Sequence, residues 1–381
     1  MSSIRVQPNR SVLSWALQRA PANLTAKFQQ LNKWLSGEAQ PTLRQLEAFA
    51  RAVAVPLGYF FLDAPPVESI PIPHFRTLPD APDQPASADL LETVRVMEQR
   101  QSWMREYLIE RGDKPLAFVG SASIYDAPAH VAQEIRRTLG IDAKWAAGQR
   151  TWSEALRALR TRAESVGILV VISSIVGNNV RRKLSVDEFR GFVLVDEYAP
   201  LVFINGADGK AAQMFTLAHE LAHVWLGRSA AFDLRALQPA RDEVEEACNR
   251  IAAEFLVPTA AFMEVWPQVQ ADADRFQKLA RYFKVSEIVA ARRALDLKVI
   301  ARDAFLRFYE AYRAQQRAKR PSASGGDFFA TQNLRLSRRF GEAVARAVQE
   351  GSLTYREAYR LTGLHGAAFD KYVAHLLGGN A

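Results

Sequence analysis

Two histidines four residues apart, His219 and His223, have the type and the spacing to bind one metal ion. An α-helix turns about 100° per residue, so both imidazoles would lie on one helix face, one turn apart. Imidazole nitrogens in this arrangement are common zinc ligands. Glu220 directly follows His219 and would point aside from that face, where a general base takes a proton from the attacking water. The stretch therefore predicts a hydrolytic zinc site.

A third ligand is expected from the helix that contains "DEVEEACNRIAAEFLVP". Glu245 and Asn249 are four residues apart there, so Glu245 would bind the metal and Asn249 would orient Glu245 or a histidine ligand through a hydrogen bond. Glu243 lies about 200° from Glu245 and cannot share its face, whereas Glu246 lies about 100° away and remains the competing ligand. Two histidines, one carboxylate and an open fourth position are typical of catalytic zinc.

Short apolar runs predict the strands that must support this helix. "PLAFVGS" (residues 115–121) and "GILVVISSIVG" (residues 167–177) are typical of buried strands, and residues 189–209 predict two strands joined by a turn. The second of these two, "APLVFING" (residues 199–206), is expected to be an edge strand that could hold an extended peptide. Helices before and after these strands complete an α+β pattern.

Composition divides the chain into four parts. Residues 1–64 predict a small helical domain, and residues 65–90 predict an extended linker because seven prolines lie between Pro65 and Pro85. Residues 91–300 would hold the zinc domain, and residues 301–381 a helical C-terminal extension. From residue 261 onward, 20 Lys and Arg outnumber 12 Asp and Glu. This basic excess indicates either contact with nucleic acid or solvated helix faces.

Several features favour a cytoplasmic protein without a membrane partner. The first residues contain no apolar run typical of a secretory signal, and the longest apolar stretch is shorter than the roughly 20 residues that a membrane helix needs. The single cysteine, Cys248, excludes an internal disulfide framework and suits a reducing compartment. We interpret Cys248 as a small core residue rather than as a metal ligand.

Two quoted stretches, "EFRGFVLVDEYAPLVFINGADGKAAQMFTLAHELAHVWLG" and "EEACNRIAAEFLVP", carry a resemblance to a known family. They resemble the ImmA/IrrE family of bacterial zinc metallopeptidases over residues 180–258. The resemblance implies a zincin-like domain in which His219, His223 and Glu245 bind zinc and Glu220 is the catalytic glutamate. It also implies a protein substrate, usually a helix-turn-helix repressor whose cleavage derepresses a stress, mobile-element, toxin–antitoxin or phage-defence response.

The N-terminal part resembles an XRE-type helix-turn-helix domain over "WLSGEAQPTLRQLEAFARAVAVPLGYFFL" (residues 34–62). The resemblance implies DNA contacts at the helix that Gly37 closes. Gln30, Asn32 and Lys33 are the candidate contact residues. The preceding segment departs from the family pattern, because "RAPANLTAKFQQLNKW" leaves room for only a short second helix. A protein-binding or dimerising remnant of such a domain is therefore the alternative to DNA binding.

The sequence therefore favours a zinc-dependent endopeptidase joined to a helix-turn-helix module. The alternative is a DNA-binding transcriptional regulator or antitoxin whose zinc domain senses or binds a partner. A zinc-stabilised scaffold for a partner toxin is a third interpretation. The presence of Glu220 favours the enzyme, because a purely structural zinc site has no use for that carboxylate.

Overall fold

The computed structural model describes residues 4–18, 24–53, 55–66, 86–230, 243–316 and 328–378. Most of the predicted proline-rich linker and the break expected near residues 320–327 lie outside these ranges. None of the helices in these ranges combines the length and the apolar character that a membrane span requires.

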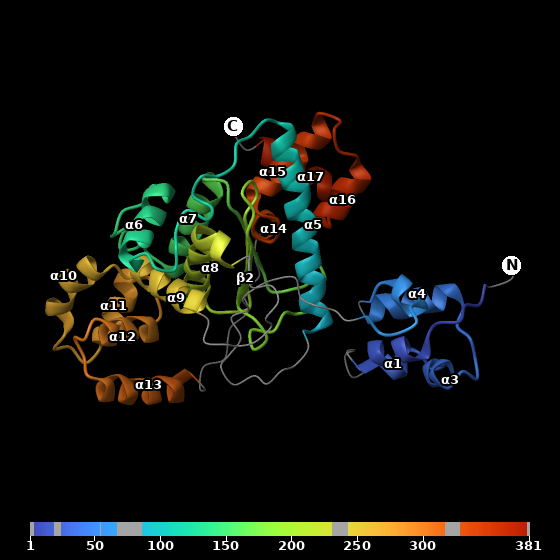
Figure 1. The fold of residues 1–381 in the computed structure, drawn as a ribbon, viewed down its shortest axis with the longest axis horizontal. Coiled ribbons are helices and arrows are strands. Elements are labelled where there is room, and N and C mark those ends of the chain that lie inside the picture. Colours follow the sequence, from blue (N-terminus) through green and yellow to red (C-terminus); the bar gives the residue numbers. More distant parts are fainter. Residues whose placement is uncertain are drawn as a thin grey trace.

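The N-terminal part is a small helical unit with its own core (Figure 1). It consists of α1 (Arg10–Gln18), α2 (Leu24–Lys27), α3 (Leu31–Ser36), α4 (Leu43–Ala52) and a 3-10 helix, η1 (Leu57–Phe61). Gly37 ends α3 at φ 81°, and Thr42 begins α4 with a capping box completed by Gln45. The described part of α2 has four residues, and the residues directly before it lie outside the described ranges, so the short second helix stays a prediction.

The centre of the larger part is a three-stranded sheet in the order β1-β3-β2. The strands are β1 (Leu169–Ser173), β2 (Gly191–Leu194) and β3 (Leu201–Asn205). β3 pairs parallel with β1 and antiparallel with β2, so the segment expected at the edge is the middle strand. The edge strand on the hairpin side is β2. Both hairpin strands are short and apolar, so nothing in their composition shows which one also pairs with β1.

Residues 115–121, predicted as a strand, instead form turns. The segment packs against the C-terminal half of a helix, α8 (Lys210–Ala230), where Phe118 stacks on Trp225 with ring centroids 4.6 Å apart. The backbone N–H of Gly120 donates to Val224 O. Its apolar residues are thus buried by a helix rather than by neighbouring strands, and an apolar run alone does not distinguish these two cases.

Both faces of the sheet are covered by helices, so all three strands are fully buried. Alternate residues of each strand enter different cores. Val170 and Ile172 join the core of the metal-site side, whereas Leu169 and Val171 join the opposite core. The first side contains α6 (Pro128–Leu139), α7 (Trp152–Ser165), α8, α9 (Glu243–Leu256), α10 (Thr259–Val269), α11 (Arg275–Phe283), α12 (Glu287–Asp296) and α13 (Arg302–Gln316).

The opposite core is built by helices from two distant parts of the sequence (Figure 1). They are α5 (Ala88–Glu110), α14 (Phe328–Leu336), α15 (Arg338–Gln349), α16 (Tyr355–Thr362) and α17 (Ala367–Gly378). Buried Arg100 of α5 donates to Leu361 O and Arg335 O. Buried Glu164 of α7 accepts from the Ser337 hydroxyl at 2.7 Å. The C-terminal helices are therefore part of the sheet's packing, which the sequence did not reveal.

Candidate metal centre

Three side chains from α8 and α9 converge on one point. His219 Nε2 and His223 Nε2 are 3.1 Å apart, and each lies 3.1 Å from an oxygen of Glu245. Two ligand atoms that lie 2.0–2.1 Å from a tetrahedral zinc ion are about 3.3 Å from each other. The separation and the donor set therefore fit a zinc ion, and these three residues form a group able to hold a metal.

Close packing of α8 on α9 brings these ligands together. Both histidines are 1 % exposed, whereas the side chain of Glu245 is 26 % exposed. On α9 the buried face contains small residues, among them Ala247, Cys248 and Ala252, which let the two helices approach. The ligand set is therefore buried on the helix side and reaches solvent beside Glu245.

The pKa values of Glu245 and His223 are both shifted by their burial and their mutual contact. Burial alone would raise the pKa of Glu245, but hydrogen bonds with His219 and His223 outweigh it and hold this pKa well below its usual range. Burial would lower the pKa of His223, yet its contacts with Cys248 and Glu245 raise it well above the usual value. These contacts favour the protonated imidazole, and a metal would displace that proton on binding.

The residues near Glu245 on α9 face the histidines or solvent as the periodicity of the helix predicts. Glu243, Glu246 and Asn249 are exposed on α9, and only Glu245 of the three nearby glutamates meets the histidines. Within the described residues no hydrogen bond links the Asn249 side chain to Glu245 or to either histidine, so its role in orienting one of them stays a prediction. Cys248 is fully buried, and burial raises the pKa of its thiol, as expected for a core residue.

Glu220 lies outside the ligand group and faces the edge strand. It is 1 % exposed, and its Oε1 would be 3.4 Å from a Cβ placed on Gly191 of β2. The carboxylate therefore lies beside the start of β2, close enough to His223 to affect the pKa of that imidazole. That is the place from which a base could act on a group lying between the metal and a peptide held along β2.

A polar cluster that sequence reasoning missed aligns β2 with α8. Asn205 Nδ2 donates to Phe189 O at 3.1 Å, and the Arg190 guanidinium pairs with Asp208 at 2.8 Å. Buried Gln213 donates to the carbonyls of Gly206 and Asp208, which close the loop between β3 and α8. These contacts fix the start of β2 against the start of α8. Polar residues directly after the apolar β3 were the only signal of this cluster in the sequence.

Gly191 should tolerate no side chain, because β2 and α8 approach closely there. A Cβ at this position would lie 2.4 Å from Thr216 Cγ2 and 2.8 Å from Phe203 O. Overpacking of this kind typically costs about 1–3 kcal/mol, so we expect Gly191→Ala to lower the free energy of unfolding by that amount. Gly209→Ala is the matched control, since a Cβ there meets nothing within 4 Å. Urea denaturation of both variants checks this; equal stability would mean that the approach is looser than described.

Comparison with known families places this centre within a recognised domain. Residues 163–295, about a third of the chain, match a peptidase family model described as the IrrE N-terminal-like domain. The match contains both histidines, Glu220 and Glu245. Residues 336–375 match a domain of unknown function (DUF8813), which covers most of α15 to α17. No curated protein matches the chain significantly. The segment that contains the candidate metal centre is thus similar to peptidases of the IrrE N-terminal-like type.

Proposed function

We propose that the protein is a zinc-dependent endopeptidase that cleaves a protein partner. The observation that carries this proposal is the convergence of His219, His223 and Glu245, with Glu220 beside them and outside the ligand set. A structural zinc site is usually closed by four protein ligands, whereas three ligands leave a position for water or substrate. The peptidase family match over the same residues supports this choice.

The residues of the centre have separate roles in the proposed reaction. His219, His223 and Glu245 would hold zinc, which as a Lewis acid polarises a peptide carbonyl and makes water more acidic. Glu220 accepts the proton of the attacking water and passes it to the leaving amine. Its burial strengthens electrostatic interactions at this point, because little bulk water is present to screen them.

The geometry of β2 supports an extended peptide as the substrate. Asn205 N donates to Arg190 O, so this pair is a hydrogen-bonded pair of the antiparallel ladder. Hydrogen-bonded and non-hydrogen-bonded pairs alternate along an antiparallel ladder. Gly191 and Val193 belong to non-hydrogen-bonded pairs, so their backbone N–H and C=O groups face away from β3. A peptide added along this edge could hydrogen-bond to them beside Glu220. The family resemblance favours a helix-turn-helix repressor in a stress, mobile-element, toxin–antitoxin or phage-defence response as that partner.

Cleavage of a peptide library tests this proposal without knowledge of the partner. We expect the zinc-loaded protein to generate new N-termini in a proteome-derived peptide library, detected by mass spectrometry, and a chelator to abolish them. Restored cleavage after zinc is added back would exclude an effect of unfolding. A zinc-loaded, folded protein that cleaves neither this library nor the products of its neighbouring genes would contradict the proposal.

A DNA-binding regulator or antitoxin is the second candidate function, and one feature of the N-terminal unit favours it. Gln30, Asn32 and Lys33 are all exposed at the start of α3. Side chains at the start of a helix are well placed to reach base edges and phosphates of a major groove. The exposure of these residues supports DNA contact as an additional or alternative output.

Lys33→Ala should weaken any DNA binding by this unit. Loss of one phosphate contact reduces the slope of log affinity against log salt by about one. Fluorescence anisotropy with a duplex of about 20 base pairs at several salt concentrations measures this slope. Arg51→Ala is the control, because its side chain is 82 % exposed on α4, outside α3. Equal slopes for wild type and Lys33→Ala, or no DNA binding at low salt, would exclude α3 as the element that contacts DNA.

A further inference from the structure

The C-terminal helices α15, α16 and α17 form a three-helix unit beside α5 (Figure 1). Within it, α16 and α17 are joined by a short turn, residues 363–366. Both glycines of this turn have a positive φ, 69° at Gly363 and 49° at Gly366, and Leu364 between them is buried. Two helices joined by a turn of three or four residues that contains glycine are typical of a helix-turn-helix.

The packing of this unit differs from that of an antiparallel helical hairpin. In a hairpin the two helices lie side by side, whereas α16 and α17 each pack on α15 rather than along one another. Phe369 of α17 meets α16 edge-on, with ring centroids 6.0 Å from Tyr355 and 5.4 Å from Tyr359. On α15, a Cβ at Gly341 would lie 2.7 Å from the Tyr372 hydroxyl of α17. A first helix that supports two others in this way is also a feature of helix-turn-helix domains.

One face of α17 is open to solvent. The residues buried on its inner side are Phe369, Tyr372 and Leu376. The residues exposed on its outer side include Ala367, Asp370, Lys371 and Ala374. At about 100° per residue, these two sets lie on opposite sides of the helix. The major groove of B-DNA is about 12 Å wide and admits a helix with one free face of this kind.

Positive charge is available on both helices. Arg356 and Arg360 are exposed one turn apart on α16, and Lys371 is exposed on α17. Within the described part of the chain, none of these three side chains forms an ion pair. The carboxylate of Glu357 on α16 is engaged in the capping box at the start of that helix. Asp370 is exposed on α17, where a carboxylate can accept a hydrogen bond from the amino group of cytosine.

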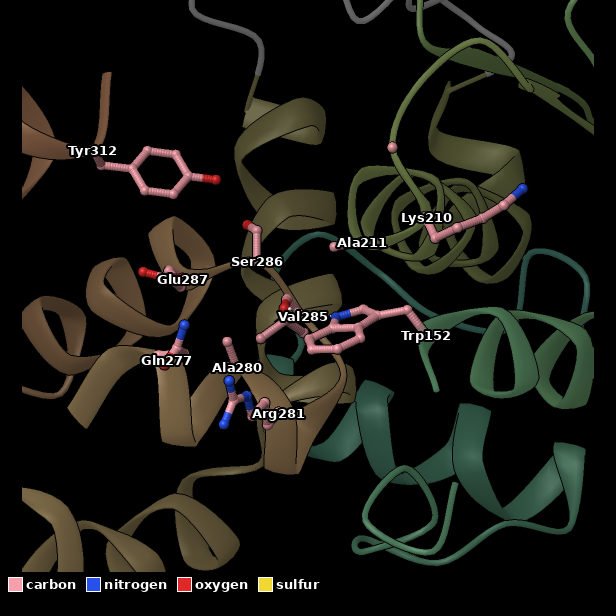
Figure 2. A pocket seen from close by; sticks show the side chains of 11 residues that line it. Trp152, Lys210, Ala211, Gln277, Ala280, Arg281, Val285, Ser286, Glu287 and Tyr312 are labelled. Carbon is pink, nitrogen blue, oxygen red and sulfur yellow. Dashed lines mark hydrogen bonds between the residues drawn. The ribbon is translucent and has the colours of Figure 1, made fainter. Parts of the chain in front are cut away.

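Helices α11 and α12 have a similar connection, residues 284–286, but no such free face. Trp152 Nε1 donates to Val285 O at 2.9 Å. Ser286 and Glu287 line a pocket whose other walls come from α7, α8, α11 and α13 (Figure 2). The turn and the start of α12 therefore face the protein, whereas α17 presents its outer side to solvent.

We propose that α16 and α17 bind double-stranded DNA, with α17 in the major groove. Lys371 would contact a base edge, because recognition helices read bases through residues near their start. Arg356 and Arg360 would contact phosphates, since the first helix of such a motif crosses the DNA backbone. This surface uses neither α3 nor the metal centre. It gives the basic excess of the C-terminal part a defined role in the fold.

Fluorescence anisotropy with duplex DNA of about 20 base pairs, at several salt concentrations, tests this inference. The full-length chain is used with the candidate contacts on α3 removed by Gln30→Ala, Asn32→Ala and Lys33→Ala. We expect a Kd of about 1–100 µM at physiological salt, the range of non-specific DNA binding. Adding Arg356→Gln, Arg360→Gln and Lys371→Gln should lower the slope of log affinity against log salt by about three. All three positions are exposed, so the unfolding midpoint should not change.

Selection from random duplexes separates base contacts from phosphate contacts. Lys371→Ala should relax the sequence preference, whereas Arg356→Ala should weaken all sequences about equally. The charge-matched control is Arg292→Gln, Arg302→Gln and Arg307→Gln, which removes three exposed cations from α12 and α13 and should leave the slope unchanged. Absence of duplex binding at low salt would overturn the inference. So would an equal loss of slope in the control, an unchanged slope without the cations of α16 and α17, or tighter binding of an RNA duplex, whose narrow major groove excludes a helix.

Discussion

Glu220→Gln is expected to retain zinc and the native fold while peptide cleavage falls by about 10²–10⁴-fold. The amide has the shape of the carboxylate, so the buried position beside β2 remains filled. It cannot accept a proton from the attacking water, and general-base catalysis typically contributes a factor of that size. Zinc content, the unfolding midpoint and the rate of library cleavage are to be measured on one preparation.

Glu246→Gln provides the matched control for this variant. Glu246 is exposed on α9, close in sequence to the ligand set but turned away from it. Its cleavage rate should equal that of wild type. If Glu220→Gln holds zinc and cleaves at the wild-type rate, Glu220 is not the base. If it holds zinc and a neighbouring operon still responds fully in cells, proteolysis is not the output and the regulator function is favoured.

Removal of a metal ligand should reduce zinc affinity by about 100-fold. Structural sites with four ligands bind zinc with a free energy of about 10–16 kcal/mol, which is roughly 3 kcal/mol for each ligand. We expect this loss for His219→Ala, His223→Ala and Glu245→Ala, because each side chain takes part in two of the three 3.1 Å contacts. Competition against a chromophoric chelator measures the affinities directly.

Glu246→Ala distinguishes the third ligand from its neighbour. It should bind zinc as wild type does, since its side chain is exposed and outside the ligand group. A larger loss for Glu246→Ala than for Glu245→Ala would move the ligand by one residue. Unchanged affinity in both histidine variants would exclude this zinc site altogether.

The centre could be predicted because it depends mainly on helix periodicity. Four-residue spacing is enough to place His219 and His223 on one helix face, and the helix angle excludes Glu243. It leaves Glu246 as a competitor, which only the packing of α9 against the two histidines separates from Glu245. The pairing of α8 with α9 required only that small residues such as Ala252 allow a close approach. Local rules were therefore sufficient for most of the candidate site.

Long-range packing could not be predicted in the same way. Residues 115–121 are apolar enough for a strand, but they lie against Trp225 of α8 instead of a sheet. The position of β3 between β1 and β2 depends on where residues 174–190 return the chain, which no local pattern specifies. The C-terminal helices complete the second core through contacts such as Arg100 to Leu361 O, more than 250 residues apart. Such contacts leave no signal in a single sequence.

An anomalous difference map collected at the zinc absorption edge from crystals of the zinc-loaded protein tests the central claim most directly. The metal centre described here predicts one strong peak per chain, about 2.0–2.2 Å from His219 Nε2, His223 Nε2 and a carboxylate oxygen of Glu245. Glu220 should lie near this peak without binding it. A peak held by other residues, a fourth protein ligand that closes the site, or no peak at these three side chains would contradict the account.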